Sequence, residues 1–463
     1  MNVRIIDAVY RAVWGIPMLV LILSVGILLT VKTRFVQLRL LPKGLRDLMG
    51  SLFASKGEGK SSFQALCTAL AATVGTGNLA GVAGAIALGG PGAIFWMWIC
   101  GLLGMAIKFA EATLAVSLRS KNIAGEWVGG PMYMIRNGLP SVFSPMAGVY
   151  ALLGVVAAFG VGNATQINTV LCSFQDVLCY FNYPCPQWLL LLLAFFLAVL
   201  LGSMLLGGAK RIGGVTQRLV PFAAALYLCL CTVVLIARVQ VVPQAFAAIV
   251  GGAFSPAAVT GGVLGSAAVA LRTGLSRGLF TNEAGMGTAS IAHAGAQVSH
   301  PVEQGTMGIV EVFLDTIVIC TMTALVILVS GVPVFYGVDA GICLTTEAFV
   351  SIFGDWVSVV ICISLILFAL ATALGWGLYG IRCAQYLFGA SAWRVFVYLQ
   401  MAVVVLGAWI PSGAVWRIAE IVNGLMAIPN LIALIFLRPK LQDLLKDYQQ
   451  KKGSCHYENL RQR

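Results

Sequence analysis

The sequence predicts an all-α polytopic membrane protein, because charge is scarce and the apolar runs are long. Charged residues make up 10% of the 463 residues and the mean hydropathy is +0.93, whereas a soluble domain carries about a quarter charged residues. Asp, Glu, Lys and Arg are absent from five long stretches, 61–107, 146–175, 187–209, 239–271 and 356–381. Each stretch can hold at least one membrane-spanning helix of about 20 apolar residues.

Helices rather than barrel strands are expected over these runs. In hydrocarbon every backbone N–H and C=O must be bonded internally, and barrel strands would appear as short alternating segments. The first apolar helix lacks a cleavage motif of small residues and precedes a basic loop, so we expect it to be retained. We predict eleven spanning helices, approximately over 12–31, 62–88, 92–118, 146–172, 187–206, 212–237, 260–290, 304–330, 356–381, 392–410 and 416–437.

Lys and Arg gather in alternate loops, which sets the expected orientation. Segment 32–60 and the tail after 437 are rich in basic residues, whereas 173–186 and 331–355 contain none. Cytoplasmic loops carry the basic excess, so we expect the N-terminus outside and the C-terminus in the cytoplasm of a cell inner (plasma) membrane. The net charge of +12 belongs to these loops. The lipid bilayer is therefore the expected partner, and nucleic acid is not.

Two of the expected helices contain polar, glycine-rich interruptions, at 72–81 and at 271–285. Glycine costs a helix about 1 kcal/mol relative to alanine, so the backbone can open there. Broken helices in corresponding positions of two inverted repeats mark the binding site of many transporters. Freed N–H groups attract a carboxylate, and freed carbonyls suit an ammonium group or Na⁺. The alternative is that Gly75-Thr76-Gly77 is only a close-packing patch between helices.

Several motifs resemble those of the alanine or glycine:cation symporter family, the sodium:alanine symporters. The resemblance implies a leucine-transporter-type fold, with five plus five helices in an inverted repeat and a peripheral first helix. It also implies Na⁺-coupled symport of small neutral amino acids such as alanine and glycine by alternating access, without enzyme activity. The motifs are 75–83 (GTGNLAGVA), 89–98 (GGPGAIFWMW), 108–111 (KFAE), 129–133 (GGPMY), 282–287 (NEAGMG) and 374–376 (LGW).

This fold divides the chain into four expected segments. No cofactor is expected apart from Na⁺ as the coupling ion, and no obligate protein partner is expected beside the amino acid and the bilayer. The segments are the first helix and basic cytoplasmic loop (1–60), the first five-helix repeat (61–240), the second five-helix repeat (241–437) and the cytoplasmic tail (438–463).

The resemblance also implies which residues bind the amino acid. Thr76, Gly77 and Asn78, at the first interruption, would meet the charged ends of the substrate. Gln166 would line the pocket with a neutral amide. Trp376 would limit the pocket volume, which suits short side chains.

Na⁺ would lie between the first interruption and the ninth expected helix. Carbonyls near Ala72 and Gly75 and the hydroxyl of Thr372 would supply oxygen ligands, which hard cations require. The chain has Ala371 where we expect family members to carry a hydroxyl, so the composition of its ion site departs from the pattern.

Ionisable residues within the apolar helices are further candidates for function. Lys108 and Glu111 share a helix face, either as a pair or as anchors near the cytoplasmic end. Asp315, or Glu311 one turn earlier, is expected to hydrogen-bond freed backbone, with proton coupling as the alternative. Arg272 and Arg277 are candidate gating partners of Glu283, and a cytoplasmic anchor is the alternative for Arg277.

Other classes of protein remain as alternatives. A membrane enzyme would need a metal or acidic constellation, and none is visible in the sequence. A channel would need a continuous polar pore. A closer alternative keeps the fold and carries glutamine or serine, or couples to H⁺. Cys179 and Cys185 fall in one expected outer loop, where a disulfide is an open alternative.

Overall fold

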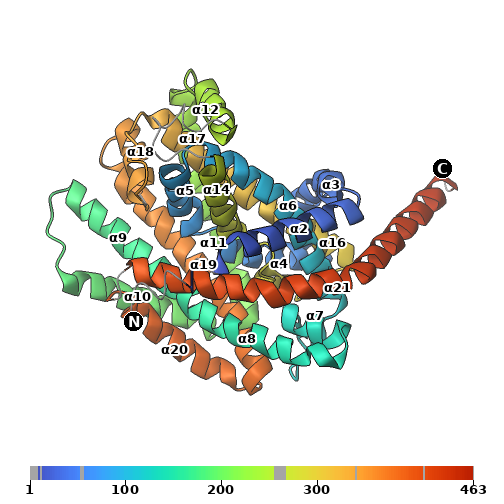
Figure 1. Ribbon diagram of the computed structural model, residues 1–463. Coiled ribbons are helices and arrows are strands. Elements are labelled where there is room, and N and C mark those ends of the chain that lie inside the picture. The colour runs from blue at the N-terminus through green and yellow to red at the C-terminus, as the bar shows by residue number, and fades with distance from the viewer. Residues whose placement is uncertain are drawn as a thin grey trace.

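The structure is a computed structural model that describes residues 9–10, 13–52, 57–254, 267–338, 341–409 and 412–461. Three expected helices extend beyond these ranges, because residues 12, 260–266 and 410 lie outside them. Figure 1 shows a bundle of helices with the C-terminal helix reaching out from it.

The first half of the chain forms helices, with one short hairpin between them. These elements are α2 (Ile16–Lys32), α3 (Val36–Leu52), α4 (Glu58–Thr73), η1 (Gly77–Gly81), α5 (Val82–Gly89), α6 (Gly92–Ser117), β1 (Ser120–Lys121), β2 (Trp127–Val128), α7 (Pro131–Gly138), η2 (Ser141–Phe143), α8 (Ser144–Phe159), η3 (Gly160–Ala164), α9 (Thr165–Tyr180), α10 (Gln187–Leu205) and α11 (Gly208–Ala237). The strands β1 and β2 pair antiparallel, with Ser120 opposite Val128.

The described part of the second half is helical. Its elements are α12 (Val242–Phe254), α14 (Ala267–Asn282), α15 (Thr288–His293), α16 (Pro301–Val312), η4 (Phe313–Cys320), α17 (Thr321–Ser330), α18 (Cys343–Phe353), α19 (Val357–Phe388), α20 (Ala392–Leu406) and α21 (Ser412–Arg461). The segments η1, η3 and η4 are π-helical turns within longer helices.

Seven described helices are long and apolar enough to cross a membrane, and two bent helix pairs raise the number to nine. Each of the eleven expected ranges overlaps a helix or a broken helix, but α14, α15 and α20 are not among these nine. The prediction of a multi-pass helical membrane protein is therefore confirmed. The count of eleven and the five-plus-five repeat stay predictions.

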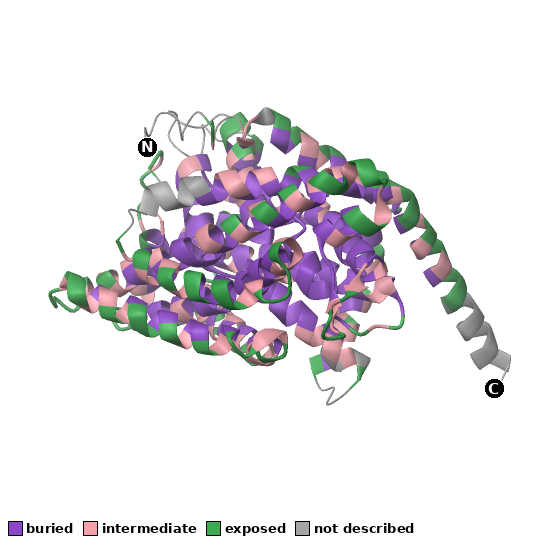
Figure 2. Cartoon of the chain, turned by 90° about the horizontal axis from the view of Figure 1, so that it is seen from below, coloured by how far each residue is buried: buried purple, intermediate pink, exposed green. Residues whose placement is uncertain are grey.

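The burial pattern suits a bundle surrounded by lipid. Buried residues fill the middle of the bundle and exposed ones lie along its outer surfaces (Figure 2). On α10, Leu192, Phe195 and Phe196 are between 56% and 61% exposed. Large apolar side chains on an outward face require an apolar environment.

The basic segment after the first helix is itself a helix. The segment expected to be a cytoplasmic loop between spans is helical in α3, and its cytoplasmic placement stays a prediction. Arg34 and Phe35 both have a φ near +55° (56° and 55°), and the axis turns by 78° between α2 and α3. Left-handed backbone at two successive non-glycine residues is uncommon and here makes a sharp corner. The helix α3 is amphipathic, which a count of its charges alone did not reveal.

The first break, residues 74–76, lies where the sequence predicts it. The helix α4 ends at Thr73, Val74 is extended with φ −78° and ψ 97°, and the chain bends by 53° before it resumes a helical course.

The second break comprises residues 283–287, at the end of the predicted interruption. The polar stretch from Leu271 to Asn282 remains helical in α14, which corrects the expected start of the opening. Glu283 (φ 53°), Gly285 (φ 93°) and Gly287 (φ 76°) adopt left-handed conformations. Glycine pays little for this conformation, so the two glycines allow the helix to stop and restart as α15.

The helix α6 lies at the centre of the bundle, where it packs along both α14 and α16. A Cβ on Gly274 of α14 would fall 2.2 Å from the carbonyl oxygen of Ala93, and one on Gly305 of α16 would fall 2.0 Å from Thr113 Oγ1. Glycine is therefore required at both crossings. This close contact holds the second break against the middle of α6.

The tail after residue 437 continues α21 as a helix to Arg461. Near its middle, Tyr448 accepts a hydrogen bond from Lys43 of α3, and His300 lies 3.2 Å from Asp447. The two cysteines of the expected outer loop, Cys179 and Cys185, are free thiols in this structure.

Candidate substrate and cation site

Asn78 holds the first break in shape. Its side-chain oxygen accepts a hydrogen bond from the backbone N–H of Gly75 over 2.8 Å. Its amide nitrogen donates to Asp315 Oδ1 of η4 over 2.7 Å. Asn78 and Asp315 are fully buried. Both ends of the Asn78 side chain are thus engaged, and Asp315 supports the break through Asn78.

The helix α19 passes directly against the first break. A Cβ on Gly75 would fall 2.5 Å from Thr372 Oγ1, and one on Gly375 would fall 2.8 Å from the backbone nitrogen of Ala72. The structure thus brings Thr372 to the backbone segment that contains Ala72 and Gly75, as predicted. No side chain fits between these elements.

Two buried hydroxyls at this point have no partner among the described residues. Thr76 Oγ1 and Thr372 Oγ1 are both buried and make no hydrogen bond there. Thr76 is 0% exposed and Thr372 is 2% exposed. Buried polar atoms are almost always satisfied, so two unsatisfied oxygens indicate a place for a polar ligand or ion.

Gln166 comes to the same break from α9. Its side-chain oxygen lies 3.5 Å from the backbone nitrogen of Thr76, a long hydrogen bond. Its amide nitrogen donates to the carbonyl of Val161 over 3.2 Å. The neutral amide expected beside the first break is therefore present.

Phe280 of α14 closes another side of the first break, and the sequence reasoning missed it. A Cβ on Gly77 would lie 3.7 Å from the Phe280 ring and 3.7 Å from Thr281 Oγ1. Gly77 therefore has ordinary packing space beside an aromatic ring. A phenylalanine in an apolar run carries no local signal that separates a pocket residue from a packing residue.

Trp376 lies against the second break. Its indole N–H donates to Glu283 Oε1 over 2.9 Å, and the side chain is fully buried. Thr288 donates to the other oxygen of Glu283 over 2.6 Å. The single N–H of Trp376 is thus bound at the second break and is not available to Thr76 at the first. The expected gating pair between Arg277 and Glu283 is absent from the described contacts, since Arg277 pairs with Glu420 over 3.1 Å.

Glu111 binds the second break from α6. Its Oε1 accepts hydrogen bonds from the backbone N–H of Gly285 (3.0 Å) and of Gly287 (3.1 Å). The amide of Asn430, on α21, donates to the same oxygen over 2.7 Å and to the carbonyl of Gly285 over 2.8 Å. Glu111 thus satisfies backbone groups that the break sets free, and the interpretation of Glu111 as a surface anchor is wrong.

Lys108 forms a buried ion pair one turn away. Its Nζ lies 3.1 Å from Glu311 Oε1, with side chains 1% and 0% exposed. His293 Nε2 lies 2.9 Å from the other Glu311 oxygen, and the amide of Gln304 lies 2.7 Å from His293 Nδ1. The anchor interpretation is therefore also wrong for Lys108.

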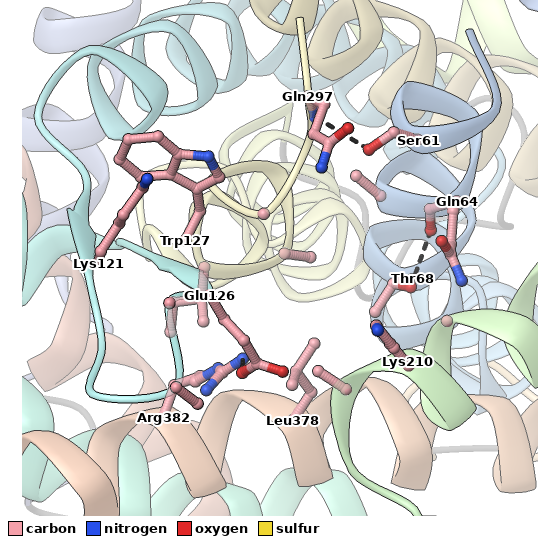
Figure 3. A pocket seen from close by; sticks show the side chains of 18 residues that line it. Ser61, Gln64, Thr68, Lys121, Glu126, Trp127, Lys210, Gln297, Leu378 and Arg382 are labelled. Atoms are coloured by element: carbon pink, nitrogen blue, oxygen red, sulfur yellow. Dashed lines mark hydrogen bonds and ion pairs between the residues drawn. The ribbon is translucent and has the colours of Figure 1, made fainter. Parts of the chain in front are cut away.

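A cavity of about 560 Å³ opens near the N-terminal end of α4. Figure 3 shows Gln64 and Thr68 on one wall and the pair Glu126 and Arg382 on another. Thr68 precedes Val74, where the first break begins, by six residues, about 9 Å along the helix axis. This wall of the cavity therefore lies between one and two helical turns from the first break.

An ion pair attaches the β1–β2 hairpin to α19 along one wall of this cavity. Arg382 donates to Glu126 Oε2 over 2.8 Å, and this hydrogen bond lowers the pKa of Glu126 from its usual value. A carboxyl with a lowered folded pKa contributes stability above its unfolded pKa and loses it as the pH falls through the folded pKa. Acid is therefore expected to weaken this contact.

Glu126→Gln is expected to loosen the hairpin at neutral pH, because glutamine keeps the shape and removes the charge that Arg382 binds. Deuterium uptake by the amides of residues 120–128 should rise in this variant. Lowering the pH through the folded-state pKa of Glu126 should produce the same rise in deuterium uptake in the wild type. The pH dependence of the intrinsic exchange rate is corrected for in this comparison. Glu303→Gln, which changes a carboxyl that accepts a hydrogen bond from Ser299 far from the hairpin in sequence, serves as control. Unchanged uptake in Glu126→Gln would contradict the role of the ion pair.

A solved structure shows the fold to which these two broken helices belong. The chain resembles the structure of MhsT in complex with L-phenylalanine, with a TM-score of 0.58 and 15% identity, over 82% of this chain and 97% of that one. That transporter has the leucine-transporter fold, and this chain shares the fold. Its family makes it a multi-pass transporter rather than an enzyme.

The chain belongs to the sodium:alanine symporter family, whose sequence profile matches residues 1–461. It is 41% identical over 440 residues to the sodium/alanine symporter AgcS of Methanococcus maripaludis, covering 94% of each chain. It is 38% identical over 442 residues to the probable sodium/glutamine symporter GlnT of Bacillus subtilis, covering 95% of this chain and 89% of that one. The resemblance seen in the motifs is thus confirmed.

Proposed function

We propose that this protein is a Na⁺-coupled symporter of small neutral amino acids, alanine or glycine, that works by alternating access. The observation that carries the proposal is the pair of unsatisfied buried hydroxyls, Thr76 Oγ1 and Thr372 Oγ1, beside an opened helix. A broken helix offers freed backbone groups to ligands at membrane depth. Family membership supports the coupling ion and the class of substrate.

The amino acid is proposed to bind at the first break. Thr76 and Gly77 would offer backbone N–H groups, and Thr76 its hydroxyl, to the carboxylate. Asn78 acts in this proposal by holding the break open, since both ends of its side chain are engaged. Gln166 supplies a neutral amide, and Trp376 limits the volume from the second break.

Na⁺ is proposed to bind between α4 and α19. Its ligands would be carbonyls near Ala72 and Gly75 and the hydroxyl of Thr372, because hard cations take oxygen ligands. The close approach of Thr372 to Gly75 supports this arrangement. Ala371 supplies no oxygen from its side chain.

The proposed topology places the N-terminus outside the inner membrane and the C-terminus in the cytoplasm. Segments expected on the cytoplasmic side contact one another, since Gln442 donates to the carbonyl of Lys32 over 3.2 Å. On the expected outer side, the backbone N–H of Gly337 donates to the carbonyl of Ala87 over 2.9 Å. The cavity near Thr68 would then be the cytoplasmic exit.

Uptake of radiolabelled alanine into proteoliposomes is expected to require an inward Na⁺ gradient. Thr76→Ala and Asn78→Ala should abolish it, because the first removes a ligand and the second lets the break relax. Competition with unlabelled glycine, serine and glutamine ranks the substrates. Uptake that follows a pH gradient and ignores Na⁺ would overturn the ion site, and no uptake of any of the four would overturn the substrate class.

The same assay separates the remaining candidates. Glutamine is a specific alternative because a relative named as a probable sodium/glutamine symporter is 38% identical to this chain. Serine, or coupling to H⁺, would keep the same fold. A single-channel current in the absence of saturable uptake would favour a channel over a carrier.

A further inference from the structure

Glu111 and Asn430 are hydrogen-bonded through one pair of atoms and left unsatisfied at the other. Asn430 Nδ2 donates to Glu111 Oε1 over 2.7 Å. Glu111 Oε2 and Asn430 Oδ1 are both buried and have no partner among the described residues. When Glu111 is ionised, Glu111 Oε2 and Asn430 Oδ1 are both hydrogen-bond acceptors. Neither side chain then has a proton that could form a hydrogen bond between these two oxygens.

The two unsatisfied oxygens belong to one small region. Glu111 accepts the backbone N–H of Gly287, and a Cβ on Gly287 would fall 2.6 Å from Asn430 Oδ1. The amide cannot be turned around, because its nitrogen already donates to two acceptors, Glu111 Oε1 and the carbonyl of Gly285. The free oxygens therefore remain acceptors in this arrangement.

The charged groups around Glu111 do not balance unless a proton or a cation is added. Lys108 neutralises Glu311, which His293 also contacts. Among the described residues, Glu283 receives hydrogen bonds only from the neutral donors Trp376 and Thr288. In the same part of the chain, Glu111 receives only neutral N–H donors. An uncompensated carboxylate at membrane depth is costly. Within the described ranges, the other titratable groups that face this site are the phenols of Tyr150 on α8 and Tyr379 on α19.

We propose that Glu111 is a proton-binding site, protonated at Oε2 and paired with Asn430 as a carboxylic acid with an amide. The Oε2–H donates to Asn430 Oδ1, while Asn430 Nδ2 donates back to Glu111 Oε1. One proton taken from water thus satisfies both buried oxygens at once. The site goes beyond the proposed Na⁺-coupled transport, because it stands on this geometry whichever amino acid is carried.

Proton loss at Glu111 acts on the second break. The same side-chain pair holds the N–H groups of Gly285 and Gly287 and the carbonyl of Gly285. Without the proton, Asn430 Oδ1 loses its donor and Glu111 Oε2 becomes a charged acceptor, so the two side chains are joined by one hydrogen bond instead of two. The break is then freer to change its conformation, which couples protonation to the part of the fold that moves in a broken-helix transporter.

Infrared spectroscopy of the whole protein in liposomes tests the site directly. The C=O stretching band of protonated carboxyl groups is recorded from about pH 5 to about pH 9, where an unperturbed glutamate is ionised. Glu111→Gln is expected to lose one component of this band, since glutamine copies the protonated acid in shape and hydrogen bonding. Glu303→Gln, at an exposed carboxyl, should keep every component.

A second variant leaves the carboxyl in place. Asn430→Leu removes the acceptor of the proposed proton, and the Glu111 component is expected to shift to the position of an acid without a hydrogen-bond acceptor. Identical spectra for the wild type and Glu111→Gln would overturn the proposal. A Glu111 carboxylate band that shifts when Na⁺ replaces K⁺ would also overturn it and assign the oxygens to a metal ion. Both spectroscopic outcomes are independent of alanine uptake. Failure of the proton site can therefore be distinguished from failure of the proposed transport function.

Discussion

Replacing Lys108 with methionine is expected to lower the free energy of unfolding by about 3–5 kcal/mol, the usual cost of breaking a buried ion pair on one side. The Nζ of Lys108 lies 3.1 Å from Glu311 Oε1, and both side chains are inaccessible to solvent, at 1% and 0% exposure. Methionine fills much of the lysine volume, so the expected loss reflects the charge left on Glu311. Denaturant unfolding of the purified protein in mild detergent measures the change.

Two further variants separate this charge effect from packing. Lys108→Met combined with Glu311→Gln removes both charges and keeps an acceptor for His293, so most of the lost stability should return. Lys446→Met breaks a surface ion pair, in which the side chains of Lys446 and Asp443 are 73% and 76% exposed. This variant should change the free energy of unfolding by less than about 1 kcal/mol. If Lys108→Met is as stable as Lys446→Met, the buried pair does not stabilise the fold.

The first break could be predicted because its signal is local. Two glycines and a polar side chain lie within four residues of one another, and Asn78 bonds back to Gly75 three positions earlier. The second break was placed too early, because polar residues of α14 remain helical while the opening falls at Glu283. A glutamate with positive φ has no sequence signal that distinguishes it from its helical neighbours.

The partners of the second break could not be predicted from a single sequence. Glu111 is 174 residues from Gly285, and Asn430 is 319 residues from Glu111. Such contacts depend on how helices cross, and a hydropathy profile records only which segments are apolar. The profile also placed Lys108 and Glu111 near the end of an apolar run, where surface anchoring is the ordinary role of charge.

The same distinction applies to the ion site. The approach of Thr372 to Gly75 was expected from the family resemblance, since nothing in the spacing of these residues brings α19 to α4. The structure adds the physical requirement for glycine at position 75, because a Cβ there would lie 2.5 Å from Thr372 Oγ1. This contact makes the proposed site sensitive to a single methyl group.

Gly75→Ala is expected to raise the Na⁺ concentration needed for half-maximal uptake by at least about tenfold. The new methyl group must displace Thr372 Oγ1, and even second-shell changes at metal sites typically cost about 10–100-fold in affinity. Thr372→Val removes the same hydroxyl with little change in shape and should produce the same loss. Uptake of radiolabelled alanine over a series of Na⁺ concentrations measures both.

Gly214→Ala provides the matched control, because, beyond the neighbouring backbone of α11 itself, no atom of the described residues lies within 4 Å of the Cβ it would add. It should leave the Na⁺ dependence unchanged and, at an interior helical position, add about 0.5–1 kcal/mol of stability. Combining Gly75→Ala with Thr372→Ala makes room for the added methyl group but leaves no hydroxyl at position 372. The free energy of unfolding should therefore return toward the wild-type value, whereas the Na⁺ affinity should stay low. Wild-type Na⁺ dependence in Gly75→Ala would show that Thr372 does not ligate the ion, whereas recovery of affinity in the double variant would show that the methyl group acted only by steric displacement.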